Sequence, residues 1–233
     1  MTYPGGKNGS GVFQQIINQI PPHEIYIVPF LGRDAVLLHK KPAAASIGID
    51  IDEDVIQWWR DHIAAGGDGT ITLIHGNAIS YLRKLRCRRS TFVYCDPPFL
   101  FDVRSSKRKI YTHEFGDRGQ HEKLLKVLQS LNCMVAISGY WSSLYESSLQ
   151  GWRHISYNAV KRSGEVVREF LWMNYPEPVE LHDYRFLGQN FREREKIARQ
   201  KKRWRRRLLK MSRLQRCALL SSLADLGDAS GSL

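Results

Sequence analysis

The chain has 233 residues, of which 42% are hydrophobic and 11% aromatic, and its formal net charge is +12. This composition excludes a disordered chain, and the length suits one α/β domain with an appendage. No apolar run approaches the roughly 18 residues that span a bilayer, the start is too polar for a signal peptide, and the four cysteines lack CxxC spacing. We therefore expect a cytoplasmic protein without a metal site, a disulfide framework or a membrane partner.

Short apolar runs alternate with amphipathic helical stretches through most of the chain. The expected strands are 24–30, 45–51, 71–75, 91–95 and 133–138. The expected helices are 11–20, 34–39, 54–64, 78–85 and 120–131. This alternation predicts a parallel sheet with helices on both faces. Two later runs, 152–158 and 166–174, flank a Ser163-Gly164 turn signal and predict an antiparallel hairpin at the sheet edge.

The C-terminal part has a different composition. Between Arg192 and Arg216 there are 13 Lys/Arg against 2 Glu, so nearly all of the excess charge lies there. A near-neutral body with one basic arm indicates a polyanionic partner, most often nucleic acid, rather than a solvated or partner-facing helix.

We expect two domains, 1–183 and 184–233, the second being a basic helical extension. Its helical pattern is predicted to break near Met211-Ser212. The last stretch, "GDASGSL" from Gly227, is typical of a frayed tail.

The most informative motif is "CDPPF", which follows the apolar strand 91–95. Asp96 is expected at the carboxyl edge of the sheet, where α/β proteins bind ligands. Pro97 and Pro98 fix two φ angles and remove two N–H donors, which leaves rigid carbonyl groups. A carboxylate and a fixed carbonyl form a double acceptor for an exocyclic amino group, and Phe99 supplies a stacking face for the ring. The motif predicts a nucleobase pocket, against the alternative of a proline turn capped by the acid.

Other strand ends carry weaker signals. Gly32 in "PFLGRDAV" allows a cofactor to approach the backbone, although a plain strand–helix turn has the same sequence character. Asp50 in "GIDID" suits ribose hydroxyls, and Asp52 suits a helix cap. Asn77 either caps the next helix, which is favoured, or contacts an adenine edge. The loop "YPGGK" at 3–7 is tight enough to lie over a ligand.

Taken in order, "YPGGK", "PFLGRDAV", "GIDID", "CDPPF" and "SGY" resemble the Dam-type DNA adenine-N6 methyltransferases over roughly residues 1–176. The DPPF tetrapeptide resembles the DPPY/F signature of that family. The resemblance implies a seven-stranded, mostly parallel, Rossmann-like methyltransferase sheet with a reversed terminal hairpin. It also implies methyl transfer from S-adenosylmethionine to adenine N6 in DNA, with the base flipped out of the duplex. The compactness suits a phage-like or restriction-modification enzyme.

The same resemblance implies roles for individual residues. The flipped adenine would be bound by the catalytic motif Asp96, Pro97, Pro98 and Phe99. The cofactor would be contacted by Tyr3, Lys7, Phe30, Gly32, Asp50 and Asp96. Positioning a sulfonium leaving group against the amine requires no metal.

The chain departs from the family pattern in its cofactor loop and in its size. Asp34 stands where the FxGxG loop of the family has its second glycine, and it could cap the helix or repel the carboxylate of the cofactor. Val28 replaces a frequent acid. Only about 40 residues separate Asp50 from DPPF, too few for a large target-recognition insertion.

We therefore expect DNA contacts from the segment 101–120 and from the arm. The expected contacts are Arg104, Lys107, Arg108, Lys109, Tyr111, Arg199, Lys201, Lys202, Arg203, Arg205 and Arg206. Two alternatives stay open: methylation of an RNA base or of cytosine N4, and a DNA-binding protein with a degenerate cofactor pocket.

Overall fold

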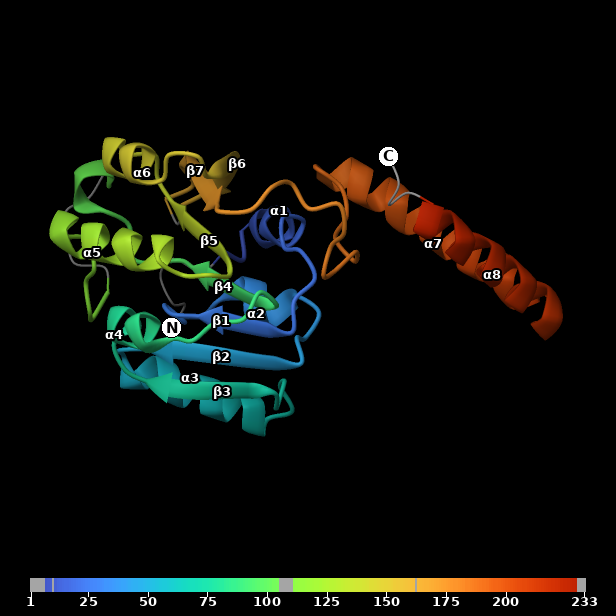
Figure 1. Ribbon diagram of the computed structural model, residues 1–233, viewed down its shortest axis with the longest axis horizontal. Helices are drawn as coiled ribbons and strands as arrows, with labels where there is room; N and C mark the ends of the chain where they lie inside the picture. The colour runs from blue at the N-terminus through green and yellow to red at the C-terminus, as the bar shows by residue number, and fades with distance from the viewer. Residues whose placement is uncertain (1–6, 10, 105–110, 162, 230–233) are drawn as a thin grey trace. The chain divides into compact units, whose positions relative to one another are not determined.

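The computed structural model describes residues 7–9, 11–104, 111–161 and 163–229. The chain divides into two compact units, Met1–Phe186 and Leu187–Leu233, each of which is described by itself (Figure 1).

The first unit is a seven-stranded sheet between two layers of helices (Figure 1). Its strands are β1 (Ile25–Val28), β2 (Ala45–Asp50), β3 (Ile71–His75), β4 (Thr91–Cys95), β5 (Met134–Gly139), β6 (Arg153–Val160) and β7 (Val166–Met173). Its helices are α1 (Val12–Ile17), α2 (Ala35–His39), α3 (Glu53–Ala64), α4 (Ala78–Lys84), α5 (Arg118–Gln129) and α6 (Ser143–Ser148), with a 3-10 turn, η1, at Phe101–Val103.

The strand order is β3-β2-β1-β4-β5-β7-β6. Strands β1 to β5 pair in parallel, whereas β7 is antiparallel to both β5 and β6. This confirms the predicted sheet with its reversed terminal hairpin. The order reverses between β1 and β4, and ligands of open α/β sheets bind beyond the carboxyl ends of the strands at such a switch point.

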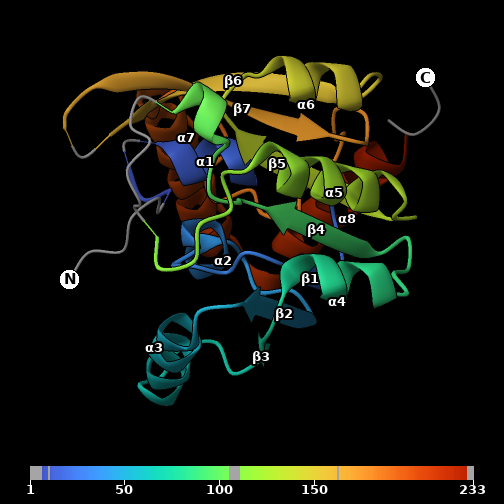
Figure 2. The same ribbon diagram turned by 90° about the vertical axis from the view of Figure 1, so that its left-hand side faces the viewer.

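Two hydrophobic cores hold the sheet between its helices. Ile16 of α1, Val36 of α2 and Trp59 of α3 pack on one face. Leu124 of α5 and Leu144 of α6 pack with α4 on the other (Figure 2). Every residue of β4 is buried, which explains its continuous apolar sequence.

Helix α6 and turn η1 were not among the predicted elements. Both are short, at six and three residues, so neither displays a helical period in the sequence. Helix α6 depends instead on a local signal, because Oγ of Ser142 accepts a hydrogen bond from the Tyr145 amide at 3.2 Å.

The second unit contains α7 (Phe191–Lys210) and α8 (Arg213–Ala229). The break between them lies at Met211-Ser212, as predicted. The predicted frayed tail is wrong in part, because α8 continues through Gly227 to Ala229. One glycine costs a helix only about 1 kcal/mol, too little to end it where the neighbours favour helix. Residues 230–233 lie outside the described residues.

In the described ranges, no helix combines the length and the apolar character that crossing a bilayer requires.

Candidate active site

A cavity of about 450 Å³ lies at the carboxyl ends of β1, β2 and β4, beside the switch point of the sheet. It is within the usual size range of small-molecule sites. The residues predicted for the site that line it together are Lys7, Phe30, Gly32, Asp50, Asp96, Pro97, Pro98, Phe99 and Tyr111. The fold thus brings together residues from five separate stretches of sequence.

Asp50 ends β2 and ties two loops to the cavity wall. Its Oδ2 accepts a hydrogen bond from the Gly32 amide at 2.8 Å, and its Oδ1 accepts one from the Asp52 amide at 2.9 Å. Burial raises the pKa of Asp50, although these backbone amides oppose the rise. A carboxylate has about four lone-pair sites, so Asp50 retains acceptor capacity for a ligand with two hydroxyls. Asp52 caps α3 by accepting a hydrogen bond from the Asp54 amide, as predicted.

Side chains of α3 hold the glycine loop that follows β1. Gly32 has a φ of +43°, which is a conformation that favours glycine. Its carbonyl accepts a hydrogen bond from Nε1 of Trp59 at 2.8 Å. The Arg33 guanidinium lies 4.6 Å from the centre of the Trp58 ring. These contacts give the loop a fixed shape against the cavity.

Asp34, the departure from the family loop, is the N-cap of α2. Its Oδ1 accepts a hydrogen bond from the Val36 amide at 2.8 Å, and the residue is buried. Burial raises the pKa of Asp34 to about 7. The carboxyl group is therefore half protonated near neutral pH, which weakens its repulsion of an anionic ligand group. Asn77 likewise caps α4, through the Ser80 amide, while lining the cavity.

Asp96 lies directly after β4, and one of its oxygens is fixed by two donors. Oδ1 accepts a hydrogen bond from Oγ of Ser138 at 2.7 Å and lies 3.0 Å from Nζ of Lys7. Within the described part of the chain, Oδ2 has no hydrogen-bond partner. Burial raises the pKa of Asp96, although Lys7 and Ser138 act in the opposite direction. The motif thus offers an acceptor oxygen on a rigidly oriented carboxyl group.

Lys7 is buried between two carboxylates. Its Nζ lies 2.9 Å from Oε2 of Glu169 and 4.6 Å from the centre of the Phe99 ring. Burial alone would lower the pKa of Lys7, but Asp96 and Glu169 raise it well above its usual value. The amine is therefore cationic, and with both carboxylates ionised the three groups sum to one negative charge.

Phe99 packs against a second ring from a neighbouring strand end. The Phe99 and Tyr140 rings meet edge to face at 4.6 Å between centroids. Such pairs contribute roughly 0.5–1.5 kcal/mol beyond the area that they bury. The rigid prolines and Phe99 line the cavity, and Tyr140 packs against the Phe99 ring.

Residues 111–115, which follow the motif in sequence, line the cavity. This stretch lies beside the end of the motif, because the Phe101 amide donates a hydrogen bond to the Gly116 carbonyl at 2.9 Å. Arg104 pairs with Glu114 at 2.9 Å, with its side chain only 6% exposed, so this ion pair accounts for its position. Tyr111 lines the cavity, and burial raises its pKa to about 12.

Contact of Arg104 and Tyr111 with nucleic acid stays a prediction. The expected cofactor residue Tyr3 and the expected DNA contacts Lys107, Arg108 and Lys109 lie outside the described residues.

Sequence reasoning missed the residues that hold Asp96, Phe99 and Lys7 in place, which are Ser138, Tyr140 and Glu169. Glu169 carried a usable signal. It alternates in register with Leu171 and Met173, so the period of two in β7 places a carboxylate on the buried face of a strand. A buried acid requires a partner, and here that partner is Lys7.

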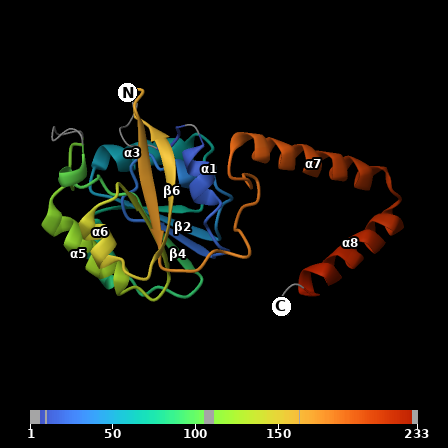
Figure 3. The same ribbon diagram turned by 90° about the horizontal axis from the view of Figure 1, so that it is seen from above.

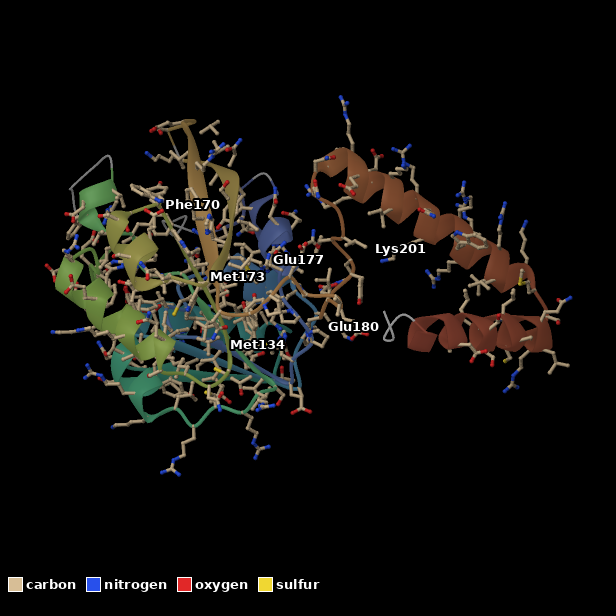
Figure 4. All side chains as sticks on the ribbon, turned by 45° about the horizontal axis from the view of Figure 1, so that its top comes forward. Met134, Phe170, Met173, Glu177, Glu180 and Lys201 are labelled. Atoms are coloured by element: carbon tan, nitrogen blue, oxygen red, sulfur yellow. The ribbon has the colours of Figure 1, made fainter. Side chains whose placement is uncertain are left out.

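Most cations of the second unit lie on α7, and Arg213 and Arg216 lie on α8. In a 3.6-residue helix, Arg199, Lys202, Arg203, Arg206 and Lys210 fall on one face, and Ile197, Trp204 and Leu208 fall on the other. Figure 4 shows long nitrogen-tipped side chains extending from this helix, on which Lys201 is labelled. The six predicted contacts on α7 are all exposed, and Arg199 pairs with Glu195 at 2.8 Å within the helix. DNA binding by them stays a prediction.

Across the described ranges, no three His, Cys, Asp or Glu side chains are placed to hold a metal ion.

No protein-family model and no curated protein matches the sequence. Solved structures with a similar fold include a candidate methyltransferase, yhhF, from Escherichia coli, at 18% identity, 70% coverage of this chain, 80% of the other and a TM-score of 0.45. An rRNA methylase from Streptococcus thermophilus has 13% identity, 69% and 92% coverage and a TM-score of 0.45. A SAM-dependent methyltransferase from Agrobacterium tumefaciens has 13% identity, 70% and 60% coverage and a TM-score of 0.43. At these identities the likeness concerns the fold alone.

Proposed function

We propose that the chain is an S-adenosylmethionine-dependent methyltransferase that acts on adenine N6 in duplex DNA. The observation that carries this proposal is the sharing of one cavity by Asp50 with its glycine loop and by the Asp96-Pro97-Pro98-Phe99 turn. The first group suits a nucleoside, and the second suits a planar amine. The resemblance of DPPF to the Dam-type signature supports adenine as the base.

The residues fit the cofactor on three counts. Asp50 keeps acceptor capacity for the ribose hydroxyls while it fixes Gly32. Phe30 and Leu31 give the cavity an apolar wall. The single net negative charge of the trio Lys7, Asp96 and Glu169 suits a cationic sulfonium. S-adenosylmethionine supplies, when bound, a methyl group on an excellent leaving group.

The residues of the chain position the target amine and supply a proton acceptor. Asp96 and a proline carbonyl accept the two hydrogens of the target amine, which directs the nitrogen lone pair away from them. Phe99 stacks on the base, and Tyr140 supports that ring. The nitrogen loses one proton when its new bond to carbon forms, and the raised pKa of Asp96 suits its carboxylate to receive that proton.

Cytosine N4 and amines of RNA bases present the same two hydrogens, so the test must separate substrates. Calorimetry measures binding of S-adenosylmethionine first. Transfer of a tritiated methyl group to duplex DNA, single-stranded DNA and RNA is then compared between the wild type and Asp96→Ala. We expect binding by both proteins and transfer to duplex DNA by the wild type alone. Absence of cofactor binding would overturn the enzymatic proposal, and transfer to RNA alone would overturn the choice of DNA.

A further inference from the structure

The terminal hairpin, β6 and β7, extends past the carboxyl end of the neighbouring strand β5. Strand β7 pairs with β5 only as far as Gly139 opposite Phe170, whereas the ladder between β6 and β7 continues to Val160 opposite Val166. Four residue pairs, 157–160 with 166–169, therefore lie beyond the end of β5, about 13 Å at 3.3 Å per residue. We call these four pairs the overhanging ribbon. Figures 2 and 3 show it projecting beyond the other strands.

The overhanging ribbon has one buried face and one exposed face. Tyr157, Ala159 and Glu169 are buried, and Glu169 reaches Lys7 in the candidate active site. On the opposite face, Asn158 lies directly across from Arg168, and both are exposed. Since alternate residues of a strand point to opposite faces, one ribbon carries a catalytic-site contact inward and a polar pair outward.

The outward pair is chemically suited to base edges. Asn makes two hydrogen bonds to adenine, and Arg makes two to guanine, on the major-groove side. In the described ranges, the side chains of Asn158 and Arg168 form no hydrogen bond or ion pair with other residues. The neighbouring pair on the same face, Val160 and Val166, is 47% and 61% exposed. Apolar side chains at that position suit thymine methyl groups.

The charge of the hairpin also suits a nucleic acid. Residues 153–169 contain four Lys/Arg and two Glu. Both acids have cationic partners, Glu169 with Lys7 and Glu165 with Lys161 at 3.0 Å. The major groove of B-form DNA admits a two-stranded ribbon, whereas that of A-form RNA is too narrow for side chains to read.

Contacts connect the ribbon to the base pocket. Lys161 at the turn lies 6.0 Å from the centre of the Tyr140 ring, and Tyr140 packs against Phe99 of the catalytic motif. We propose that the overhanging ribbon enters the major groove of B-form DNA, where Asn158 and Arg168 read base edges beside the flipped base. This inference rests on the proposed function. The ribbon would recognise the DNA sequence in a chain that is too short to contain a large target-recognition insertion.

Selection from a pool of randomised DNA duplexes tests the ribbon through binding alone. We expect the wild type and Asp96→Ala to enrich the same sequence. Arg168→Lys, which keeps the charge but loses the planar fork, and Asn158→Ala should each relax the preference at one or two positions by roughly 10-fold or more. Arg89→Ala is the control, since Arg89 is exposed just before β4, at the amino ends of the parallel strands, whereas the ribbon lies beyond the carboxyl end of β5.

Two results would overturn the proposal that the ribbon reads DNA sequence. One is an unchanged sequence preference in both ribbon variants, and the other is no sequence preference in the wild type. Competition by double-stranded RNA should be at least about 10-fold weaker than by duplex DNA, and equal competition would also overturn it. Failure of methyl transfer with an intact preference would reject the proposed function and leave the ribbon standing.

Discussion

Lys7 and Asp96 form a buried ion pair, with 3.0 Å between Nζ and Oδ1 and side chains 5% and 16% exposed. A lysine and an acid separated by 89 positions in the chain thus meet at the end of the central strand β4. The pair fixes both the charge and the orientation of the motif, because Ser138 donates to the same oxygen and Glu169 holds the other side of the lysine.

Replacing Lys7 by methionine should destabilise the protein in a pH-dependent way. Removal of one partner from a buried pair costs about 3–5 kcal/mol, because it leaves an uncompensated charge. The pKa of Asp96, which Lys7 lowers, should rise further, so the folded state would take up a proton as the pH falls. Urea unfolding should therefore show a larger loss at pH 8 than at pH 5. An equal loss at both values would contradict the account.

Glu169→Gln should impair methyl transfer while S-adenosylmethionine affinity stays within about threefold of the wild type. We expect kcat to fall by at least 10-fold, since Lys7 loses the carboxylate that positions it. Glu169 also raises the pKa of Asp96, so its loss should move the acid limb of the pH–rate profile to lower pH. The control is Glu122→Gln, which removes an exposed ion pair with Arg118 worth a few tenths of a kcal/mol. If kcat fell but the acid limb of the pH–rate profile stayed in place, Glu169 would have only a structural role.

Asp34→Asn should stabilise the protein above neutral pH. The pKa of Asp34 is raised by burial to about 7 in the folded state, so its contribution to stability is complete below its ordinary value near 4 and is lost as the pH rises through 7. Asparagine keeps the cap on α2 without that charge. The free energy of unfolding should exceed that of the wild type by roughly 2–4 kcal/mol at pH 8.5, and the difference should shrink toward pH 4. A constant difference across this range would refute the assignment.

Deletion of residues 192–233 should weaken DNA binding without affecting the cofactor. Each neutralised phosphate contributes about 0.9 to the slope of log affinity against log salt, so loss of six contacts should flatten the slope by roughly 5. Affinity titrations between 50 and 200 mM salt measure it. A slope unchanged by the deletion would remove the arm from the account of DNA binding.

Periodicity and strand-end motifs predicted much of this molecule. Every expected strand is present. The central strands β4 and β5 are marked by apolar runs buried on both faces, whereas the edge strand β6 alternates toward its end between buried and exposed residues. The motif residues Asp50 and Asp96 were placed at one sheet edge because parallel strands end there. The partners of Lys7 could not be assigned in advance, since they depend on the register of β7 against β5. The same register places Asn158 and Arg168 beyond the end of β5. No local sequence pattern reveals that position.

The identity of the base that the protein methylates distinguishes adenine N6 from the other candidate amines. Purified protein is incubated with S-adenosylmethionine and duplex DNA, and the digested nucleosides are analysed by mass spectrometry beside an Asp96→Ala control. We expect N6-methyladenine in the wild-type reaction and none with the variant. N4-methylcytosine, or no modified base in DNA from a protein that binds the cofactor, would contradict it.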